Sequence, residues 1–444
     1  MKIFSANLRT TSSLLAILLI SCQIGCDTSR PGNAAPENMA TVAPARQLPD
    51  PDDNVAVTAL EDAGYILKKN RDGVVADLSI SSPTDISKSF QYLSGVPNVT
   101  VARFTGPGMS DKGLEAVASL TKLTRLDFSE SRITDTTLDT VAKLPELQVL
   151  LLRRVSVSDE SLGKLAGLQK IRAIDLRNTH TGDEGVKQLA KLKSLADLQL
   201  EKSDVTDECA QYLASMPLKG LNLNYCTSIS NDTMKVLGGM TTLENLQLDH
   251  TKINDKGMAH LSKLTRLKRL RIRGTDVTGE GLKHIAGAKN LARFELRESS
   301  LDDQGLEIIS ALPNVTFLDL AECKLVSPEG IKKIGKLKKL TYLGFWETKL
   351  NDDAMSALGD LTKLQELDLK ATSITDASAD TITKFTELKK VNLAGTQLTD
   401  EGFKKIAAMK NLKWMNVANT DISSDLLDEL FEDREDLEVS ESEN

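Results

Sequence analysis

The fold of this chain is decided by a stretch that reads LQELDLKATSITDASADTITKFTE, residues 364–387. The next 24 residues, 388–411, read LKKVNLAGTQLTDEGFKKIAAMKN and align with it without a gap. Repetition at a fixed period of about 20 to 50 residues is typical of proteins built from stacked repeats. We therefore expect one continuous array of similar units rather than several separate globular domains.

Each unit has the pattern of a strand followed by a turn and a helix. Leu367 and Leu369 are separated by one polar residue, a spacing typical of a strand with one buried face. Thr375 offers a hydroxyl that can cap the start of a helix. Ile382 and Phe385, three residues apart, lie on one face of that helix. A single unit cannot bury these side chains, so we expect the units to stack around a shared core.

The repeated pattern L-x-x-L-x-L-x-x-T-x-I-T-D-x-G-L-x-x-L-x-x-L resembles that of the leucine-rich-repeat family, over roughly residues 75–430. The resemblance implies an α/β solenoid with a curved, parallel concave sheet and helices on the convex side. Many members of the family place Asn after the strand, where this chain mostly has Thr, Ser or Cys. This departure resembles the bacterial and F-box-associated subclasses. A hydroxyl there can bond backbone groups across the turn, as Asn would. The residues at this position are Ser131, Thr179, Ser203, Cys226, Thr251, Thr275, Ser299, Cys323, Thr348, Thr372, Thr396 and Thr420.

The period predicts fifteen strands in the array. Their last apolar residues are 24 positions apart, except around Leu223 and Phe345, where the spacing changes by one. Such a sheet is long enough to hold a protein segment or a glycan chain. The residues counted are Ile80, Phe104, Phe128, Leu152, Leu176, Leu200, Leu223, Leu248, Ile272, Leu296, Leu320, Phe345, Leu369, Leu393 and Val417.

The N-terminal residues resemble a bacterial lipoprotein signal. Lys2 and Arg9 precede an apolar run, residues 14–20, that is too short to span a bilayer. Residues 19–22, Leu-Ile-Ser-Cys, resemble a lipobox, which implies that residues 1–22 hold a signal peptide and that Cys22 is lipidated. Cys26 is an alternative anchor, and an ordinary secretory signal is a second alternative. Either signal predicts export, and a lipidated cysteine predicts a lipid anchor in the membrane of the bacterial envelope.

The segments that flank the array have their own character. Residues 23–53 are rich in Pro and poor in large apolar residues, so we expect an extended, disordered linker. Residues 54–80 predict an N-terminal cap, with a helix and then a hairpin around Asn70-Arg71-Asp72-Gly73, before an array that spans residues 81–420. Residues 421–444 predict a C-terminal cap helix and an acidic tail, whose final residues we expect to be disordered.

The chain offers little for catalysis. Its four histidines fall at unrelated positions of different repeats, and no Gly-rich phosphate loop follows a strand. We therefore predict that it is not an enzyme and that it has neither a metal site nor a cofactor. Cys209, Cys226 and Cys323 are expected to be buried thiols without a disulfide. The net charge of -8 argues against a nucleic-acid partner, whose binding needs a basic surplus.

Side chains that point away from the core on the concave strands are the candidate ligand-binding residues. Five arginines and three aromatic residues gather on neighbouring strands, a composition that suits an acidic peptide or an anionic sugar stacked on a ring. The alternative is a solvated face on which Asp249, Asp319 and Asp368 offset the arginines. The candidate residues are Arg269, Arg271, Arg273, Arg293, Arg297, Phe317, Tyr342 and Trp346.

These observations lead to one main functional hypothesis. The chain is expected to be a non-catalytic lipoprotein of the bacterial envelope that binds a protein or a polysaccharide on its concave sheet. The resemblance to F-box-associated repeats allows a second hypothesis, a substrate-recognition adaptor of the ubiquitin-ligase type, which the export signal disfavours.

Overall fold

The computed structural model describes residues 49–442 of the 444-residue chain. The expected signal peptide, the anchor candidates Cys22 and Cys26 and nearly all of the expected linker lie outside the described residues. The described residues belong to one compact unit, residues 48–444, and only this unit is considered below.

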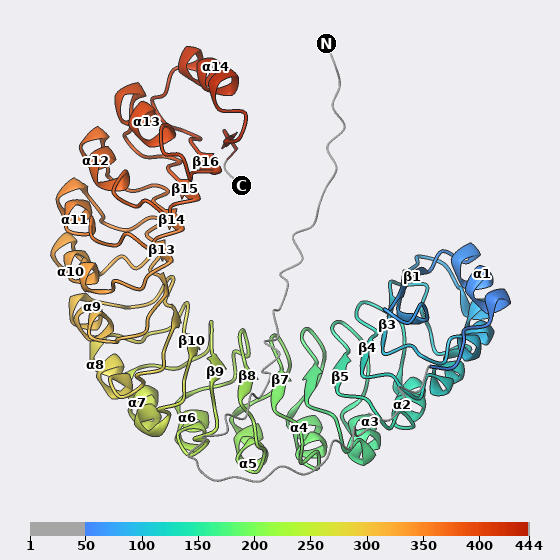
Figure 1. Ribbon diagram of the computed structural model, residues 1–444. Helices are drawn as coiled ribbons and strands as arrows, with labels where there is room; N and C mark the ends of the chain where they lie inside the picture. Colours follow the sequence, from blue (N-terminus) through green and yellow to red (C-terminus); the bar gives the residue numbers. More distant parts are fainter. Residues whose placement is uncertain (1–48, 443–444) are drawn as a thin grey trace, which may run out of the picture. The chain divides into compact units, whose positions relative to one another are not determined.

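The described residues form a 17-stranded sheet that lines the inner side of a curved array (Figure 1). The strands from β2 to β16 are the fifteen that the period predicts, and each pairs in parallel with its neighbours in an unbroken register. The predicted α/β solenoid is therefore confirmed. The strands are β1 Ile66–Lys69, β2 Val75–Ser81, β3 Val101–Thr105, β4 Arg125–Asp127, β5 Val149–Leu151, β6 Ala173–Asp175, β7 Asp197–Gln199, β8 Gly220–Asn222, β9 Asn245–Gln247, β10 Arg269–Arg271, β11 Arg293–Glu295, β12 Phe317–Asp319, β13 Tyr342–Gly344, β14 Glu366–Asp368, β15 Lys390–Asn392, β16 Trp414–Asn416 and β17 Glu438–Ser440.

Short helices cover the outer side of the array (Figure 1). None of those described is long and apolar enough to cross a membrane. The α-helices are α1 Asn54–Asp62, α2 Asp135–Val141, α3 Asp159–Leu162, α4 Asp183–Leu189, α5 Ala210–Leu213, α6 Asn231–Leu237, α7 Asp255–Met258, α8 Gly279–Leu282, α9 Asp303–Ser310, α10 Pro328–Lys332, α11 Asp352–Ser356, α12 Ala379–Ile382, α13 Asp400–Ala407 and α14 Ser424–Asp433. Turns of 3₁₀ helix occupy Ser87–Gly95, Leu114–Ser119, Gly163–Gly167, Asp207–Cys209, Ala259–Lys263, Lys283–Ile285, Lys333–Lys336 and Asp376–Ser378.

The core runs the length of the array between the sheet and the helices. Leu367, Leu369, Ile382 and Phe385, which the sequence assigns to the interior, are all buried. Burying one such side chain stabilises the fold by roughly 1.5–3 kcal/mol. Thr372 lies at the position where many family members have Asn, and its hydroxyl donates to the carbonyl of Leu369 at 2.7 Å. The expected bond across the turn is confirmed.

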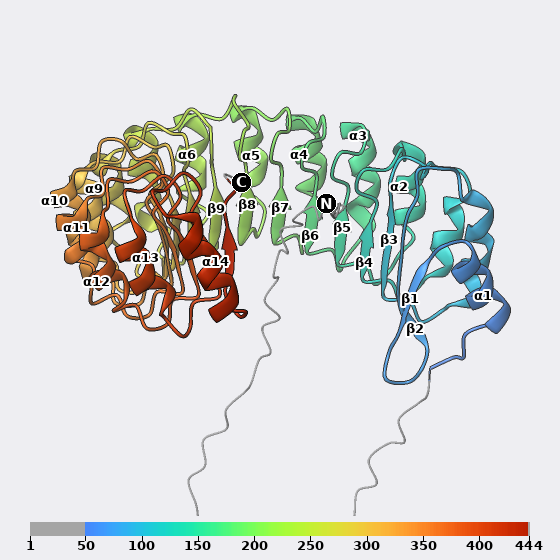
Figure 2. The ribbon, with the colours of Figure 1, turned by 90° about the horizontal axis from the view of Figure 1, so that it is seen from above.

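Both ends of the array are closed by extra strands. At the N-terminal end, β1 pairs with β2 in the predicted antiparallel hairpin, beside α1 (Figure 2). At the C-terminal end, β17 pairs in parallel with β16, although we expected the final residues to be disordered. That expectation was wrong because the backbone of Glu438 donates to the carbonyl of Lys413, and Val417 donates to Ser440. The open edge of β16 therefore orders a segment that its own acidic composition would leave unfolded.

A ladder of aspartates joins most of the repeats from Asp111 onward to the next at the start of the helices. Its members follow the cap residue, and each accepts a hydrogen bond from the backbone N–H of the cap residue in the next repeat. Asp207, for example, accepts from Ser230 N at 2.8 Å and from Thr233 Oγ1 at 2.6 Å. Asp111, Asp135, Asp159, Asp183, Asp207, Asp255, Asp303, Asp352, Asp376 and Asp400 form the Asp ladder.

The ladder also explains the glycine of the Thr-Asp-x-Gly motif. Gly281 donates its N–H to Asp255 Oδ1 at 3.0 Å, and a Cβ on this glycine would overlap that oxygen. Other repeats place a hydroxyl there, which donates to the aspartate. Ala354 stands at the glycine position of its own repeat. The preceding repeat, which faces it, has Pro328 in place of the ladder aspartate. In these repeats the side chain at this position suits the residue that faces it across the repeat boundary.

Candidate functional site

The strand register brings the predicted binding residues together on the concave face. Arg269, Arg293, Phe317 and Tyr342 lie side by side on β10 to β13, because each pairs with the next across the sheet. Arg271 follows Arg269 on the same strand. We call the eight predicted residues the Arg–aromatic cluster: Arg269, Arg271, Arg273, Arg293, Arg297, Phe317, Tyr342 and Trp346.

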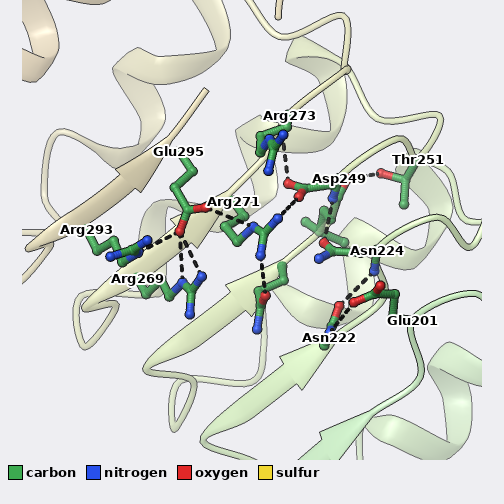
Figure 3. A network of polar contacts seen from close by, with 12 residues as sticks. Glu201, Asn222, Asn224, Asp249, Thr251, Arg269, Arg271, Arg273, Arg293 and Glu295 are labelled. Atoms are coloured by element: carbon green, nitrogen blue, oxygen red, sulfur yellow. Dashed lines mark hydrogen bonds and ion pairs between the residues drawn. The ribbon is translucent and has the colours of Figure 1, made fainter. Parts of the chain in front are cut away.

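Glu295 on β11 is the centre of the ion pairs in this cluster (Figure 3). Its carboxylate lies 2.8 Å from Arg269 Nη2, 2.7 Å from Arg293 Nε and 3.2 Å from Arg271 Nε. The Glu295 side chain is only 6% exposed. Burial alone would raise its pKa, but the nearby guanidinium groups of Arg271 and Arg269 outweigh burial and lower the pKa.

The remaining arginines differ in their partners. Arg271 pairs with Asp249, whose side chain is 1% exposed, and Arg297 Nη2 lies 2.6 Å from Glu322 Oε1. Burial raises the pKa of Asp249, although Arg271 and the backbone N–H of Arg273 oppose this rise. The Arg273 guanidinium forms no ion pair with any residue of 49–442, and its buried Nε lacks an acceptor there.

The aromatic rings are stacked between charged side chains and each other. The Arg293 guanidinium carbon lies 3.4 Å from the centre of the Phe317 ring. The other face of that ring stacks on Tyr342, with centroids 4.0 Å apart and planes 5° apart. Trp346 has the Arg297 guanidinium carbon 4.2 Å and Lys370 Nζ 5.1 Å from its ring centre. Such stacking holds long side chains in fixed positions.

The cluster therefore differs from its prediction in charge and in exposure. We expected a free basic surface beside exposed rings, but four of the five arginines are paired with carboxylates of the same face. Asp249 offsets arginine charge as the alternative reading proposed. Asp319 and Asp368 form no ion pair within residues 49–442, and burial raises the pKa of both. The structure thus brings the predicted residues together as an ordered network rather than as a bare basic patch.

A second group of side chains lies beside the cluster and was missed from the sequence. Tyr225 stacks on His250 with ring centroids 4.5 Å apart, and Lys202 Nζ lies 5.1 Å from the centre of the Tyr225 ring. These residues occupy the same position of consecutive repeats. Each is the third residue after its strand, and each has a left-handed backbone conformation. The signal was present in the sequence, since Lys202, Tyr225 and His250 share the same phase of the repeat. The left-handed residues in this row are Glu130, Arg154, Asn178, Lys202, Tyr225, His250, Gly274, Glu298, Glu322, Glu347, Ala371, Gly395 and Asn419.

The described residues give little support for a catalytic or metal-binding site. No group of three or more His, Cys, Asp or Glu side chains within residues 49–442 is placed to hold a metal ion. His180 Nδ1 contacts Asp204 at 3.0 Å, but both side chains are largely exposed. Cys209, Cys226 and Cys323 are free and buried, as predicted, and burial raises the pKa of each thiol.

Comparison with known proteins agrees with this architecture. A family model described as "Leucine Rich repeat" matches residues 311–335 and 386–407, two segments of the array whose 24-residue period and strand register extend across the other repeats. The chain is a leucine-rich-repeat protein. No curated protein matches its sequence at a significant level. The comparisons indicate no enzyme family.

Solved structures with the same fold come from bacteria and eukaryotes. A Leptospira interrogans leucine-rich-repeat protein is 20% identical, with a TM-score of 0.52, over 81% of this chain and 99% of that chain. A chain of the yeast Rad7 and Elc1 complex is 17% identical, with a TM-score of 0.53, over 75% and 84%. The ectodomain of the Arabidopsis receptor kinase HAESA, solved with an IDA peptide hormone, is 15% identical, with a TM-score of 0.51, over 85% and 76%. These similarities concern the fold.

Proposed function

We propose that this leucine-rich-repeat protein is a non-catalytic scaffold that binds a segment of a protein partner on its concave sheet. The observation that carries this proposal is the Arg–aromatic cluster. Arginine and aromatic residues dominate the energetics of protein interfaces, and here they gather on neighbouring strands where the core does not require them. The cluster is already ordered by Glu295 and by ring stacking, so a ligand that binds it has less side-chain entropy to remove.

The stacking favours a protein ligand over a polysaccharide. A sugar ring binds by lying on an uncovered aromatic face. Phe317 has Arg293 on one face and Tyr342 on the other, while Trp346 is approached by Arg297 and by Lys370 from strands on either side. Ring edges and guanidinium groups are what the cluster offers to a ligand. These groups suit the carbonyls and apolar side chains of a polypeptide.

A solved relative offers a parallel for this mode of binding. The HAESA ectodomain was crystallised with a peptide hormone ligand, and Rad7 was crystallised in a complex with Elc1. We extend protein recognition to this chain on the basis of its own cluster, since the similarity to either structure is below 20% in sequence.

The test uses two tryptophans of the same sheet. Trp346 lies in the cluster, whereas Trp414 lies on β16, three repeats further along. We expect Trp346→Ala to weaken binding of a partner captured by the full chain by at least about tenfold. Trp414→Ala is the matched control and should change binding by less than about twofold. Equal losses in the two variants would place the binding surface elsewhere.

We further propose that the protein is a lipoprotein of the bacterial envelope, anchored through Cys22. This rests on the sequence Leu-Ile-Ser-Cys at residues 19–22 after a short apolar run. Labelling with radioactive palmitate should modify the wild-type chain and Cys26→Ser, but not Cys22→Ser. The alternative function, a substrate-recognition adaptor of the ubiquitin-ligase type, predicts no labelling of any of the three.

A further inference from the structure

The row of left-handed residues carries a stacked ladder beside the Arg–aromatic cluster. Lys202 lies over Tyr225, Tyr225 stacks on His250, and His250 packs against Gly274, where a Cβ would overlap its ring. Tyr225 is 38% exposed, which makes it an exposed aromatic side chain on the rim of the sheet. An ordered and exposed aromatic pair with flanking cations is typical of an interface centre.

The hydrogen-bond donors beside this ladder are not all used. Asn224 is 1% exposed, and its Oδ1 accepts from the backbone N–H of Asp249 at 2.8 Å, which fixes the orientation of the amide. The Nδ2 of the same amide has no acceptor within residues 49–442. Arg273 lacks an ion pair with the described residues, and Lys202 likewise has none among them. A buried donor without a partner is uncommon in a complete structure.

Two of the acceptors nearby are already occupied. Asp249 accepts from Arg271 and from the backbone N–H of Arg273 at 3.0 Å, and Glu201 accepts from Asn222 Nδ2 at 3.3 Å (Figure 3). The face thus carries two cations, Lys202 and Arg273, that form no ion pair with the described residues.

We propose that Lys202, Tyr225, His250 and Arg273, here called the Tyr225 patch, bind an acidic segment of the protein partner. The proposal rests on the proposed function and specifies the chemistry of its ligand. Carboxylates of the segment pair with Lys202 and Arg273. Apolar side chains of the same segment lie against the edges of the Tyr225 and His250 rings. Charge-assisted bonds of this kind give both affinity and orientation.

The same geometry argues against an acidic polysaccharide. The Tyr225 ring has Lys202 on one side and His250 on the other, so a sugar ring has no free face to stack on. A polypeptide needs no such face, because its side chains reach the patch from an extended backbone. An acidic polysaccharide is therefore a competing outcome of the test rather than part of the proposal.

The experiment measures binding of labelled peptides to the full chain by fluorescence anisotropy. The first peptide alternates Glu with Leu, and the second has Gln in place of every Glu. We expect the Glu peptide to bind at least about tenfold more tightly than the Gln peptide at low salt, and to lose that advantage as salt is raised. The double variant Lys202→Gln/Arg273→Gln should reduce binding of the Glu peptide by at least about tenfold.

Arg154→Gln is the matched control, since Arg154 occupies the same row two repeats before Lys202 and is already paired with Glu130. This variant should stay within about twofold of wild type. Urea unfolding of each variant verifies that the fold is intact. Equal binding of the two peptides, or an unchanged affinity of the double variant, would overturn the proposal. Preferential binding of polygalacturonate at the same residues would overturn it as well.

The outcome is separable from that of the proposed function. If Trp346→Ala releases the captured partner but Lys202→Gln/Arg273→Gln does not, the concave sheet is a protein-binding surface and the Tyr225 patch has no part in it. If the double variant releases the partner and Trp346→Ala does not, the Tyr225 patch stands and the Arg–aromatic cluster is not the site.

Discussion

The Asp ladder and the Arg–aromatic cluster are both networks of charged side chains, but they differ in how often they occur. The ladder recurs at one position of successive repeats, each time with the next repeat's cap residue as donor. The cluster occurs once, on β10 to β13. A feature that helps one repeat to stack on the next recurs along the array. A feature that only one stretch of sheet possesses is a candidate for recognition.

Aspartates of the ladder and aspartates of the concave face have pKa values shifted in opposite directions. In the ladder, hydrogen bonds from Ser423 lower the pKa of Asp400, and donated bonds outweigh burial to lower the pKa of Asp207. On the concave face, burial raises the pKa of Asp249, Asp319 and Asp368. Asp207 and Asp400 therefore stabilise the folded chain at neutral pH, whereas these concave carboxylates reduce its stability there.

The largest effect is expected from removing one step of the ladder. Asp207→Ala leaves the donors of Ser230 and Thr233 without their acceptor, and should lower the free energy of unfolding by about 3 kcal/mol. Asp232→Ala is the control, because Asp232 is exposed and pairs only with Lys235 on the same helix. Its cost should stay below about 0.5 kcal/mol. Urea unfolding of the two variants tests the difference, and similar midpoints would remove the ladder from the account of stability.

A smaller loss is expected from the concave network. Glu295→Gln removes the charge that Arg269, Arg271 and Arg293 share, and should cost about 2 kcal/mol, because those guanidinium groups remain partly exposed to water. Chemical denaturation measures the change. A stabilised variant would mean that the desolvation cost of the Glu295 carboxylate exceeds the stabilisation from its three ion pairs.

The cost of replacing Gly281 of the motif should depend on the aspartate that faces it. Gly281→Ala brings a Cβ against Asp255, which should cost about 1–2 kcal/mol after the gain in helix propensity. In an Asp255→Ala background the same substitution should cost less, as the natural pair Pro328 and Ala354 suggests. Gly287→Ala, where no atom lies within 4 Å of the new Cβ, is the control and should be nearly neutral. Additive effects of Gly281→Ala and Asp255→Ala in this double-mutant cycle would refute the explanation.

The smallest effect separates the two networks by pH. Asp207 has a lowered pKa when folded, so its contribution is present above the unfolded pKa of about 3.9 and is lost as pH falls through the folded value. Asp319 has a raised pKa, so the folded state gains stability as pH falls from neutral through the folded value. Asp319→Asn should therefore remove this gain, which is about 1 kcal/mol or less of unfolding free energy between pH 7 and the folded pKa. Urea midpoints at several pH values measure it, and a steeper rise in the variant would contradict the assignment.

The repeat made the fold predictable almost to the residue. The fifteen strands followed from spacing alone, because each apolar position recurs in the same environment, and the hairpin before them followed from the turn residues 70–73. The prediction for the last residues was wrong, since β17 is ordered by the edge of β16 and not by its own composition. For the candidate site, the sequence identified which residues share the concave face. It did not identify their partners, because Glu322 and Glu295 reach different arginines through side-chain rotamers that no spacing encodes.

The sequence by itself determined the period, the inward positions and therefore the register of the strands from β2 to β16, since hydrophobic burial is the dominant force and it acts on a pattern that can be read along the chain. Only the tertiary structure decided which charges are neutralised and which remain available. Arg269 and Arg273 look alike in the sequence, yet one lies against Glu295 and the other has no ion pair within the described residues. Pairing depends on distances of a few ångströms between side chains from different repeats, and those distances exist only once the repeats have stacked.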